Sequence, residues 1–268
     1  MYALSYVKAK SVKEAAEFLA ANPEAKLLSG GMTLIPTLKQ RLAKPSHLVD
    51  IGQLDELRAI ETKGGKLAVG AGAKHHEVAT SGVVAKAIPA LADLAGLIGD
   101  PQVRNMGTIG GSVANNDPAA DYPAAVLGLN ATVVTTKREI PADQFFKGMF
   151  ATALGEGEII VRIEFPLPKA AAYSKFHHPA SGYAMAGVLI ADTAGGVRVA
   201  VTGAGPGVFR WKEAEAALAK GIKPGALEGV ALEGGDFNED IHASRAYRAN
   251  LVRVMAKRAI AKLTGAKN

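Results

Sequence analysis

Hydrophobic and polar positions in the first fifty residues have the periods of short strands and helices. The predicted elements, in chain order, are a strand over 3–9, a helix over 12–21, a strand over 25–28, a helix over about 32–42 and a strand over 47–51. The first helix has a capping box, because the Ser11 hydroxyl can accept from the NH of Glu14 while Glu14 reaches back. We therefore expect a small α/β unit that ends at about Ile51.

A second, larger unit is predicted from about Gly52 to Leu167. Its predicted elements are a strand over 66–69, a long apolar helix over 83–97, a helix that starts near Asp121, and strands over 131–135 and 158–165. The long helix contains Pro89, and a glycine-rich segment spans 107–111. Pro166-Leu167-Pro168 marks the boundary to the rest of the chain, because proline interrupts regular elements.

The remaining residues, 169–268, are predicted to form sheet plus helices. The predicted elements are strands over 184–192 and 197–202, and helices over about 211–220, 224–232 and 241–263. The two strands are joined at Gly195-Gly196, which indicates a hairpin. The last helix places one apolar stripe toward the core, made of Tyr247, Leu251, Met255 and Ala259.

The predicted fold class is α+β. We expect one two-part domain over 1–168, with parts at about 1–51 and 52–168, and a smaller α+β domain over 169–268. The chain has 268 residues, of which 49% are hydrophobic and 21% charged, which is typical of a globular protein. It has no apolar run of about 18 residues, so no membrane span is expected. The first residues lack the pattern of a signal peptide, and we expect a cytoplasmic protein.

Several chemistries are excluded by composition. The chain has no cysteine, so it cannot hold an iron–sulfur cluster through thiolates or a flavin through a cysteine sulfur. Its net charge is +6, but only 6% of residues are aromatic and the basic residues are spread out, so no nucleic-acid partner is predicted. The adjacent pairs His75-His76 and His177-His178 do not have metal-ligand spacing, so no metal site is predicted.

Two glycine-rich segments are the main candidates for binding chemistry. In the first, an apolar strand leads into Ser29-Gly30-Gly31 and a helix follows. Glycine allows positive φ and close backbone approach, and the first NH groups of a helix lack internal partners. The segment therefore suits a pyrophosphate, although an ordinary strand-to-helix turn has the same pattern. It does not match the G-x-G-x-x-G pattern of dinucleotide-binding Rossmann folds.

The second segment runs from Val103 to Ser112 and again offers glycines, a threonine hydroxyl and exposed NH groups. Asp121 follows it, just before Pro123. One interpretation makes Asp121 the N-cap of a helix, and the other makes it an acceptor for cofactor hydroxyls. The residues alone leave both interpretations open.

Taken together, the two segments resemble a known family. The chain is similar over nearly its whole length to the FAD-binding medium subunits of molybdenum hydroxylases, the group of aerobic carbon monoxide dehydrogenase and xanthine dehydrogenase. The resemblance is carried by the segments 29–34, 41–51, 102–123, 158–160, 179–183 and 247–251. It implies a two-part flavin-binding domain like that of vanillyl-alcohol oxidase, with FAD extended between its parts.

The resemblance also implies the residues that bind a non-covalent FAD. The two glycine segments would hold the pyrophosphate and ribityl chain, Ile160 would lie near the adenine or its ribose, and Lys175, Tyr183 and Ile98 would lie near the ring. The implied set is Leu28, Ser29, Gly30, Gly31, Met32, Thr33, Leu34, Ile98, Thr108, Ile109, Gly110, Gly111, Ser112, Asp121, Ile160, Lys175 and Tyr183. Met32 and Ser112 depart from the family's usual residues. No side chain is implied to act as a catalytic acid or base.

The implied function is electron transfer within a complex. FAD would receive electrons from [2Fe-2S] clusters on a small partner subunit, and a large subunit would hold the molybdenum cofactor, in a dimer of heterotrimers. The final acceptor and the organic substrate stay open. The alternatives are a stand-alone FAD-dependent oxidase or reductase of the same superfamily, and a non-catalytic flavin-binding or assembly protein.

Overall fold

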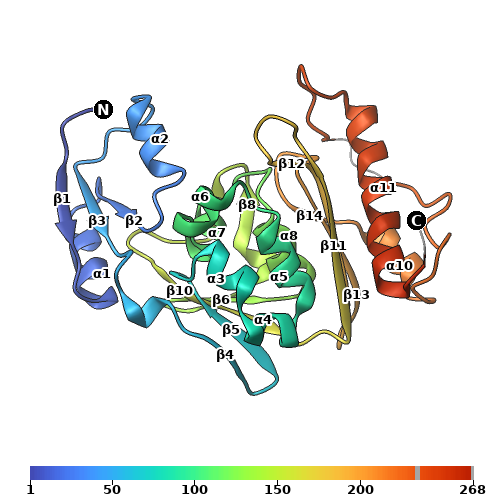
Figure 1. Cartoon of the computed structure of the whole chain (residues 1–268). Coiled ribbons are helices and arrows are strands. Elements are labelled where there is room, and N and C mark those ends of the chain that lie inside the picture. Colours follow the sequence, from blue (N-terminus) through green and yellow to red (C-terminus); the bar gives the residue numbers. More distant parts are fainter. Residues whose placement is uncertain (233–235, 267–268) are drawn as a thin grey trace.

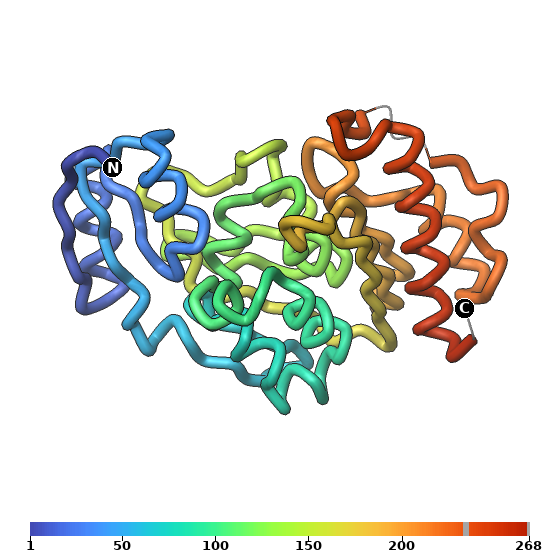
Figure 2. Tube along the Cα trace, turned by 45° about the horizontal axis from the view of Figure 1, so that its top comes forward, coloured from blue at the N-terminus to red at the C-terminus, as the bar shows by residue number. Residues whose placement is uncertain are grey.

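The computed structural model of the protein describes residues 1–232 and 236–266. Three units follow one another along the molecule, from the blue N-terminal unit to the red C-terminal one (Figure 1). A second view keeps the same order, with the middle unit between the other two (Figure 2). The α+β fold class is therefore confirmed.

The N-terminal unit is a three-stranded parallel sheet with two helices. Its elements are β1 (Ser5–Lys8), α1 (Val12–Ala21), β2 (Lys26–Leu28), α2 (Leu34–Lys39) and β3 (His47–Asp50), with strand order β1-β3-β2. The Ser11 hydroxyl accepts from the NH of Glu14 as predicted, and the Glu14 carboxylate returns to the NH of Lys10. The predicted order of five elements is confirmed. The second helix is shorter than expected because it begins at Leu34.

The middle unit is built on an antiparallel sheet with strand order β4-β5-β10-β6-β7. Helices cover the face of this sheet that is turned toward the viewer in Figure 1. The elements are η1 (Asp55–Leu57), β4 (Ile60–Lys63), β5 (Lys66–Gly70), α3 (His75–Thr80), α4 (Gly82–Ala87), α5 (Pro89–Gly96), α6 (Pro101–Met106), α7 (Ile109–Asn115), α8 (Tyr122–Gly128), β6 (Thr132–Thr135), β7 (Glu139–Pro141), α9 (Ala142–Phe145), β8 (Phe146–Gly148), β9 (Ala151–Thr152) and β10 (Ile160–Pro166).

Two predicted helices are wrong. The long helix over 83–97 is two helices, α4 and α5, because Ile88 leaves the helical region at φ −144° and ψ 79°. A residue before proline is disfavoured in the α conformation, and Pro89 starts the second helix instead of lying inside a long one. The segment 224–232 forms turns rather than a helix.

The C-terminal unit is an antiparallel sheet with strand order β11-β12-β13-β14 and two helices. Its elements are β11 (Ala170–His177), β12 (Ala184–Thr193), β13 (Gly196–Thr202), β14 (Phe209–Arg210), α10 (Lys212–Leu218) and α11 (Arg245–Thr264). The predicted hairpin at Gly195-Gly196 is confirmed, whereas β11 was not predicted. α11 buries Leu251, Met255 and Ala259 as expected.

The N-terminal turn of α11 differs from the prediction. Tyr247 is exposed, and the neighbouring Arg248 is buried in its place. The Arg248 guanidinium donates to the carbonyls of Met185 and Gly203, and it pairs with Asp240 at 2.6 Å. These bonds from its two terminal nitrogens let the Arg248 side chain occupy an interior position, which a hydrophobic stripe cannot reveal.

Candidate cofactor cleft

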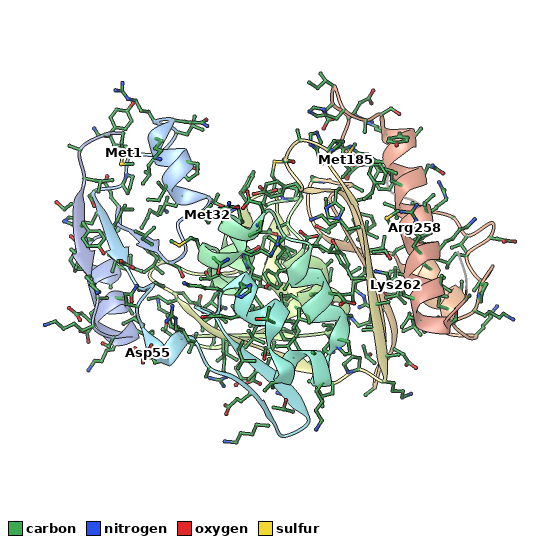
Figure 3. The ribbon with its side chains drawn as sticks, in the orientation of Figure 1. Met1, Met32, Asp55, Met185, Arg258 and Lys262 are labelled. Atoms are coloured by element: carbon green, nitrogen blue, oxygen red, sulfur yellow. The ribbon has the colours of Figure 1, made fainter. Side chains whose placement is uncertain are left out.

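A cavity of about 800 Å³ lies between the N-terminal and middle units, and the C-terminal unit closes one end of it. All of the predicted binding residues except Ile109 line it: Leu28, Ser29, Gly30, Gly31, Met32, Thr33, Leu34, Ile98, Thr108, Gly110, Gly111, Ser112, Asp121, Ile160, Lys175 and Tyr183. Ile109 does not line the cavity, because its side chain is fully buried in the core of the middle unit. Met32, labelled in Figure 3, lies on the N-terminal unit beside the middle unit.

The first glycine turn, residues 29–34, connects β2 to α2. Gly31 has φ +71°, a conformation that side chains with a Cβ rarely adopt. Within the described residues, the backbone NH groups of 30–34 have no hydrogen-bond acceptor, while the Gly31 carbonyl accepts from Ile35. Five consecutive donors on the wall of a cavity are typical of an anion site. The predicted donor role of this turn is consistent with its geometry.

The second glycine turn, residues 108–112, differs in the use of its NH groups. Ile109 donates to the carbonyl of Ala73 at 3.0 Å, and Gly110 donates to that of Ala71 at 2.9 Å. Gly111 donates to the Thr108 hydroxyl, which caps α7, and Ser112 donates to the Thr108 carbonyl. The expectation of free NH groups is therefore wrong for residues 109–112, which all donate within the chain.

The two turns touch each other, although they are far apart in the sequence. The hydroxyls of Ser29 and Thr108, separated by 79 positions, lie 3.1 Å apart. A Cβ on Gly30 would approach the carbonyl oxygen of Met106 to 2.1 Å and the Cα of Gly107 to 2.7 Å. The glycine at position 30 therefore lets the N-terminal and middle units meet at the cavity.

Asp121 lies at the other end of the cavity and is almost completely buried. It does not cap α8, because its side chain makes no bond to the helix and its backbone is helical at φ −79° and ψ −44°. Its carboxylate accepts from the Tyr173 hydroxyl at 2.5 Å and pairs with the Lys175 ammonium at 2.8 Å. Burial raises the pKa of Asp121, and the Lys175 ammonium and the Tyr173 hydroxyl oppose that rise. The helix-cap interpretation is therefore wrong.

Lys175 also fixes the loop that carries Ile98. Its ammonium donates to the carbonyl of Leu97 at 3.0 Å, and Arg104 donates to the next two carbonyls, those of Ile98 and Gly99. The Lys175 side chain has no exposed surface. Its charge is therefore part of the cavity wall and is shielded from solvent.

Tyr183 forms the rim of the cavity and is 45% exposed. It closes a loop in which the Nδ1 atom of His178 accepts from the NH groups of Ala180 and Ser181. Partial burial and the nearby Asp117 carboxylate raise the pKa of the Tyr183 phenol.

Sequence reasoning missed several parts of the cavity wall, among them His75 and the segment 154–159. His75 lies under the second glycine turn, where its NH donates to the Gly107 carbonyl. Burial and the Arg104 charge lower the pKa of His75 to about 4, so its ring is neutral near pH 7. The segment 154–159 is another missed part, and its two glycines, Gly155 and Gly157, are a signal that could have indicated it.

Glu158, within that segment, is held by several bonds. Burial acts to raise the pKa of Glu158, but bonds from the Arg138 guanidinium, the Gly155 NH and the Thr135 hydroxyl outweigh it and lower the pKa to about 2. The carboxylate therefore stays ionised at neutral pH and fixes the wall of the cavity. Among residues 1–232 and 236–266 we find no group of three metal-ligating side chains.

The chain is similar to known proteins over almost all of its length. It is 34% identical to the glyceraldehyde dehydrogenase medium chain of Sulfolobus acidocaldarius, covering 95% of this chain and 96% of that one. It is 34% identical to the carbon monoxide dehydrogenase medium chain of Hydrogenophaga pseudoflava, covering 95% of each. Its fold matches a carbon monoxide dehydrogenase structure from that organism with a TM-score of 0.86 and 33% identity, covering 100% of this chain and 99% of the other.

A further structural match is quinoline 2-oxidoreductase from Pseudomonas putida 86, with a TM-score of 0.86, 31% identity, and coverage of 99% and 98%. The sequence model of a family described as the FAD binding domain in molybdopterin dehydrogenase matches residues 2–168. That match includes both glycine turns and Asp121. The chain therefore belongs to the family of FAD-binding domains of molybdopterin dehydrogenases.

Proposed function

We propose that this chain is the FAD-binding, electron-transferring subunit of a molybdenum-containing hydroxylase or dehydrogenase. The observation that carries the proposal is the first glycine turn, whose residues 30–34 line a cavity of about 800 Å³ and whose NH groups are without acceptors in the described residues. Family membership supports the assignment of that cavity to FAD. When bound, FAD supplies the redox chemistry, because its ring can exchange electrons singly or in pairs.

The residues of the cavity fit the parts of FAD. The NH groups of the first glycine turn would donate to the diphosphate, and Gly31 gives this turn its required backbone conformation. The second glycine turn would contribute its glycine surface and the Ser112 side chain. Ile160 would pack at the adenine end, whereas Ile98, Asp121, Lys175 and Tyr183 would surround the ring end. Both glycine turns would exclude water from the diphosphate.

Other redox centres would belong to partner subunits. The chain has no cysteine, so [2Fe-2S] clusters and the molybdenum cofactor would be held by a small and a large partner. The named relatives are medium chains, and this supports a multi-subunit complex over a stand-alone oxidase. We propose a dimer of heterotrimers in the cytoplasm. No helix in residues 1–232 and 236–266 is both long and apolar enough to cross a membrane.

The proposed domain boundary lies near residue 168. The family match ends there, and β11 begins the C-terminal sheet directly after it. Limited proteolysis tests the boundary, since a stable fragment of residues 1–168 is expected.

The function is tested by the spectrum and the reactivity of the purified chain. We expect a yellow protein with one FAD that acid precipitation releases, because no covalent attachment is proposed. Dithionite should bleach the flavin band, whereas aldehydes, purines and carbon monoxide should not do so without partners. Addition of the small and large subunits should restore bleaching by substrate. A colourless chain that takes up no FAD, or rapid bleaching by an organic substrate with the chain alone, would contradict the proposal.

A further inference from the structure

A buried hydroxyl lies behind the charged pair at the ring end of the cavity. Tyr173 is on β11, and its side chain is 1% exposed. Its hydroxyl passes over Gly187 of the paired strand β12, where a Cβ would come within 2.2 Å of the oxygen. Position 187 therefore has room for this hydroxyl only because it is glycine. Lys262 of α11, labelled in Figure 3, donates to the Tyr173 carbonyl at 2.6 Å.

The hydroxyl is the first member of a chain of hydrogen bonds that reaches the cavity wall. Tyr173 donates to one carboxylate oxygen of Asp121, and the Lys175 ammonium binds the other. The same ammonium donates to the carbonyl of Leu97, the residue before Ile98. The series thus connects the C-terminal sheet to the loop that we place beside the flavin ring. In a low-dielectric interior such bonds are strong, and an unpaired member is costly.

We propose that Tyr173 is a positioning residue that keeps Asp121 ionised against Lys175, so that the charge beside the flavin stays balanced. The proposal rests on the proposed function, since it assumes FAD in the cavity. With Asp121 ionised, the Lys175 ammonium is neutralised at 2.8 Å. If Asp121 took up a proton from solvent, an unbalanced positive charge on Lys175 would remain at the cavity wall. A positive charge there would stabilise the electron-rich reduced flavin over the oxidised one.

The titratable groups around Asp121 favour this role for Tyr173. Burial already raises the pKa of Asp121, and the Tyr173 hydroxyl and the charges of Lys175 and His177 oppose the rise. Burial, and to a smaller extent the Asp121 charge, raises the pKa values of Tyr122 and Tyr183, with Asp117 also contributing at Tyr183. Loss of the Tyr173 hydroxyl removes one of the groups that hold the carboxylate charge in a buried site.

Tyr122 provides a matched control. It follows Asp121 directly and is fully buried, but its hydroxyl has no hydrogen-bond partner within the described residues. Tyr122→Phe therefore removes a buried tyrosine hydroxyl from the residue next to Asp121 without removing a bond to its carboxylate. Tyr173→Phe removes the bond and keeps the ring in the core.

The test is a redox titration of the FAD-loaded full chain from about pH 5 to pH 8. At the acid end only, the preference of Tyr173→Phe for reduced over oxidised FAD should be about tenfold greater than that of wild type or Tyr122→Phe. For a two-electron couple this equals a rise in midpoint potential of about 30 mV. Infrared difference spectra should show a protonated carboxyl band in Tyr173→Phe that Asp121→Asn removes, which separates Asp121 from His177.

Asp121→Asn supplies a second variant in case Tyr173→Phe folds poorly. It removes the negative charge permanently. The midpoint potential of its flavin should therefore be higher than that of wild type by the same amount at every pH. The proposal is overturned if Tyr173→Phe follows Tyr122→Phe at every pH, or if Asp121→Asn has the wild-type potential. A lowered melting temperature without a change in potential also overturns it, because the role of Tyr173 would then be packing alone. A wild-type chain that binds no FAD would instead remove the proposed function.

Discussion

The two glycine turns differ in where their backbone NH groups go. Those of residues 30–34, which line the cavity, have no acceptor in the described part of the chain, whereas those of 109–112 donate to Ala73, Ala71 and Thr108. The glycines of the two turns also have different structural roles. Gly31 provides a left-handed backbone, and Gly110 provides space, since its Cβ would come within 2.7 Å of the Ala71 carbonyl oxygen. Similar sequences thus produce a turn whose NH groups lack acceptors within the described residues in one case and a packing contact in the other.

The largest effect on stability is expected at the second glycine turn, residues 108–112, which we call the packing turn. Gly110→Ala should lower the free energy of unfolding by about 3 kcal/mol, because the new Cβ overlaps main-chain atoms of Ala71 that cannot move freely. Gly111→Ala is the control. Gly111 is exposed, and its Cβ would meet only the Thr108 hydroxyl, so a loss below about 1 kcal/mol is expected. Urea denaturation measures the free energy of unfolding of both variants. Equal losses in the two variants would show that Gly110 is not a packing glycine.

The stability of the protein should also depend on pH through His75, which lies under the packing turn. The folded-state pKa of about 4 lies below the unfolded value of about 6.5, so the unfolded chain binds more protons between these values. Stability should therefore fall as the pH falls through this window, by about 2 kcal/mol between pH 7.5 and pH 5.

His75→Asn should remove that part of the pH dependence. His76→Asn should retain it, since His76 is the exposed neighbour. Denaturant midpoints at the two pH values give the comparison. If His75→Asn has the same pH dependence as wild type, the buried His75 ring is not its source.

At the first glycine turn, residues 29–34, we expect Gly31→Ala to weaken FAD binding at least tenfold and to cost about 1–2 kcal/mol of stability. A Cβ at φ +71° strains the backbone that aligns the NH groups. Gly65→Ala is a matched control, because Gly65 has φ +74° in the turn between β4 and β5 and no atom lies within 4 Å of its Cβ position. It should cost similar stability and leave FAD affinity unchanged, as measured by titration calorimetry. If Gly65→Ala weakened FAD binding and Gly31→Ala did not, the diphosphate would bind away from the first glycine turn.

The smallest effect concerns the bond that joins the two turns. Ser29→Ala should cost about 0.5–1 kcal/mol, since it removes the contact with the Thr108 hydroxyl. Thr108→Ala should cost about 1 kcal/mol more, because it also removes the cap of α7. A double-mutant cycle should show coupling between the two positions. Strictly additive losses would mean that the hydroxyls do not interact in solution.

Local signals explain why the N-terminal unit could be predicted from the sequence. Ser11 caps α1, short apolar runs give β2 and β3, and Gly31 marks a turn with positive φ. The break between α4 and α5 could also have been predicted, because Pro89 disfavours a helical Ile88. β11 was missed because its inward and outward residues do not alternate clearly in polarity, and only pairing with β12 defines it.

Most of the predicted binding residues line the cavity, but the interactions among them could not be predicted from the sequence. The residues of both glycine turns carry a recognisable pattern, yet the acceptors Ala71 and Ala73 lie on a different segment and follow from the tertiary fold. The pairing of Asp121 with Tyr173 and Lys175 spans more than 50 positions and has no local signal. Sequence reasoning therefore assigned Asp121 two roles, neither of which included its ion pair.

Residue-resolved amide hydrogen exchange tests the difference between the two turns most directly. Without FAD, the NH groups of 30–34 should exchange rapidly and those of 109–112 slowly, because only the latter are hydrogen-bonded within the chain. FAD should slow exchange at 30–34, whereas riboflavin, which lacks the diphosphate, should not. Unchanged exchange at 30–34 on addition of FAD, or equal protection by riboflavin, would contradict the claim that the first glycine turn binds the diphosphate.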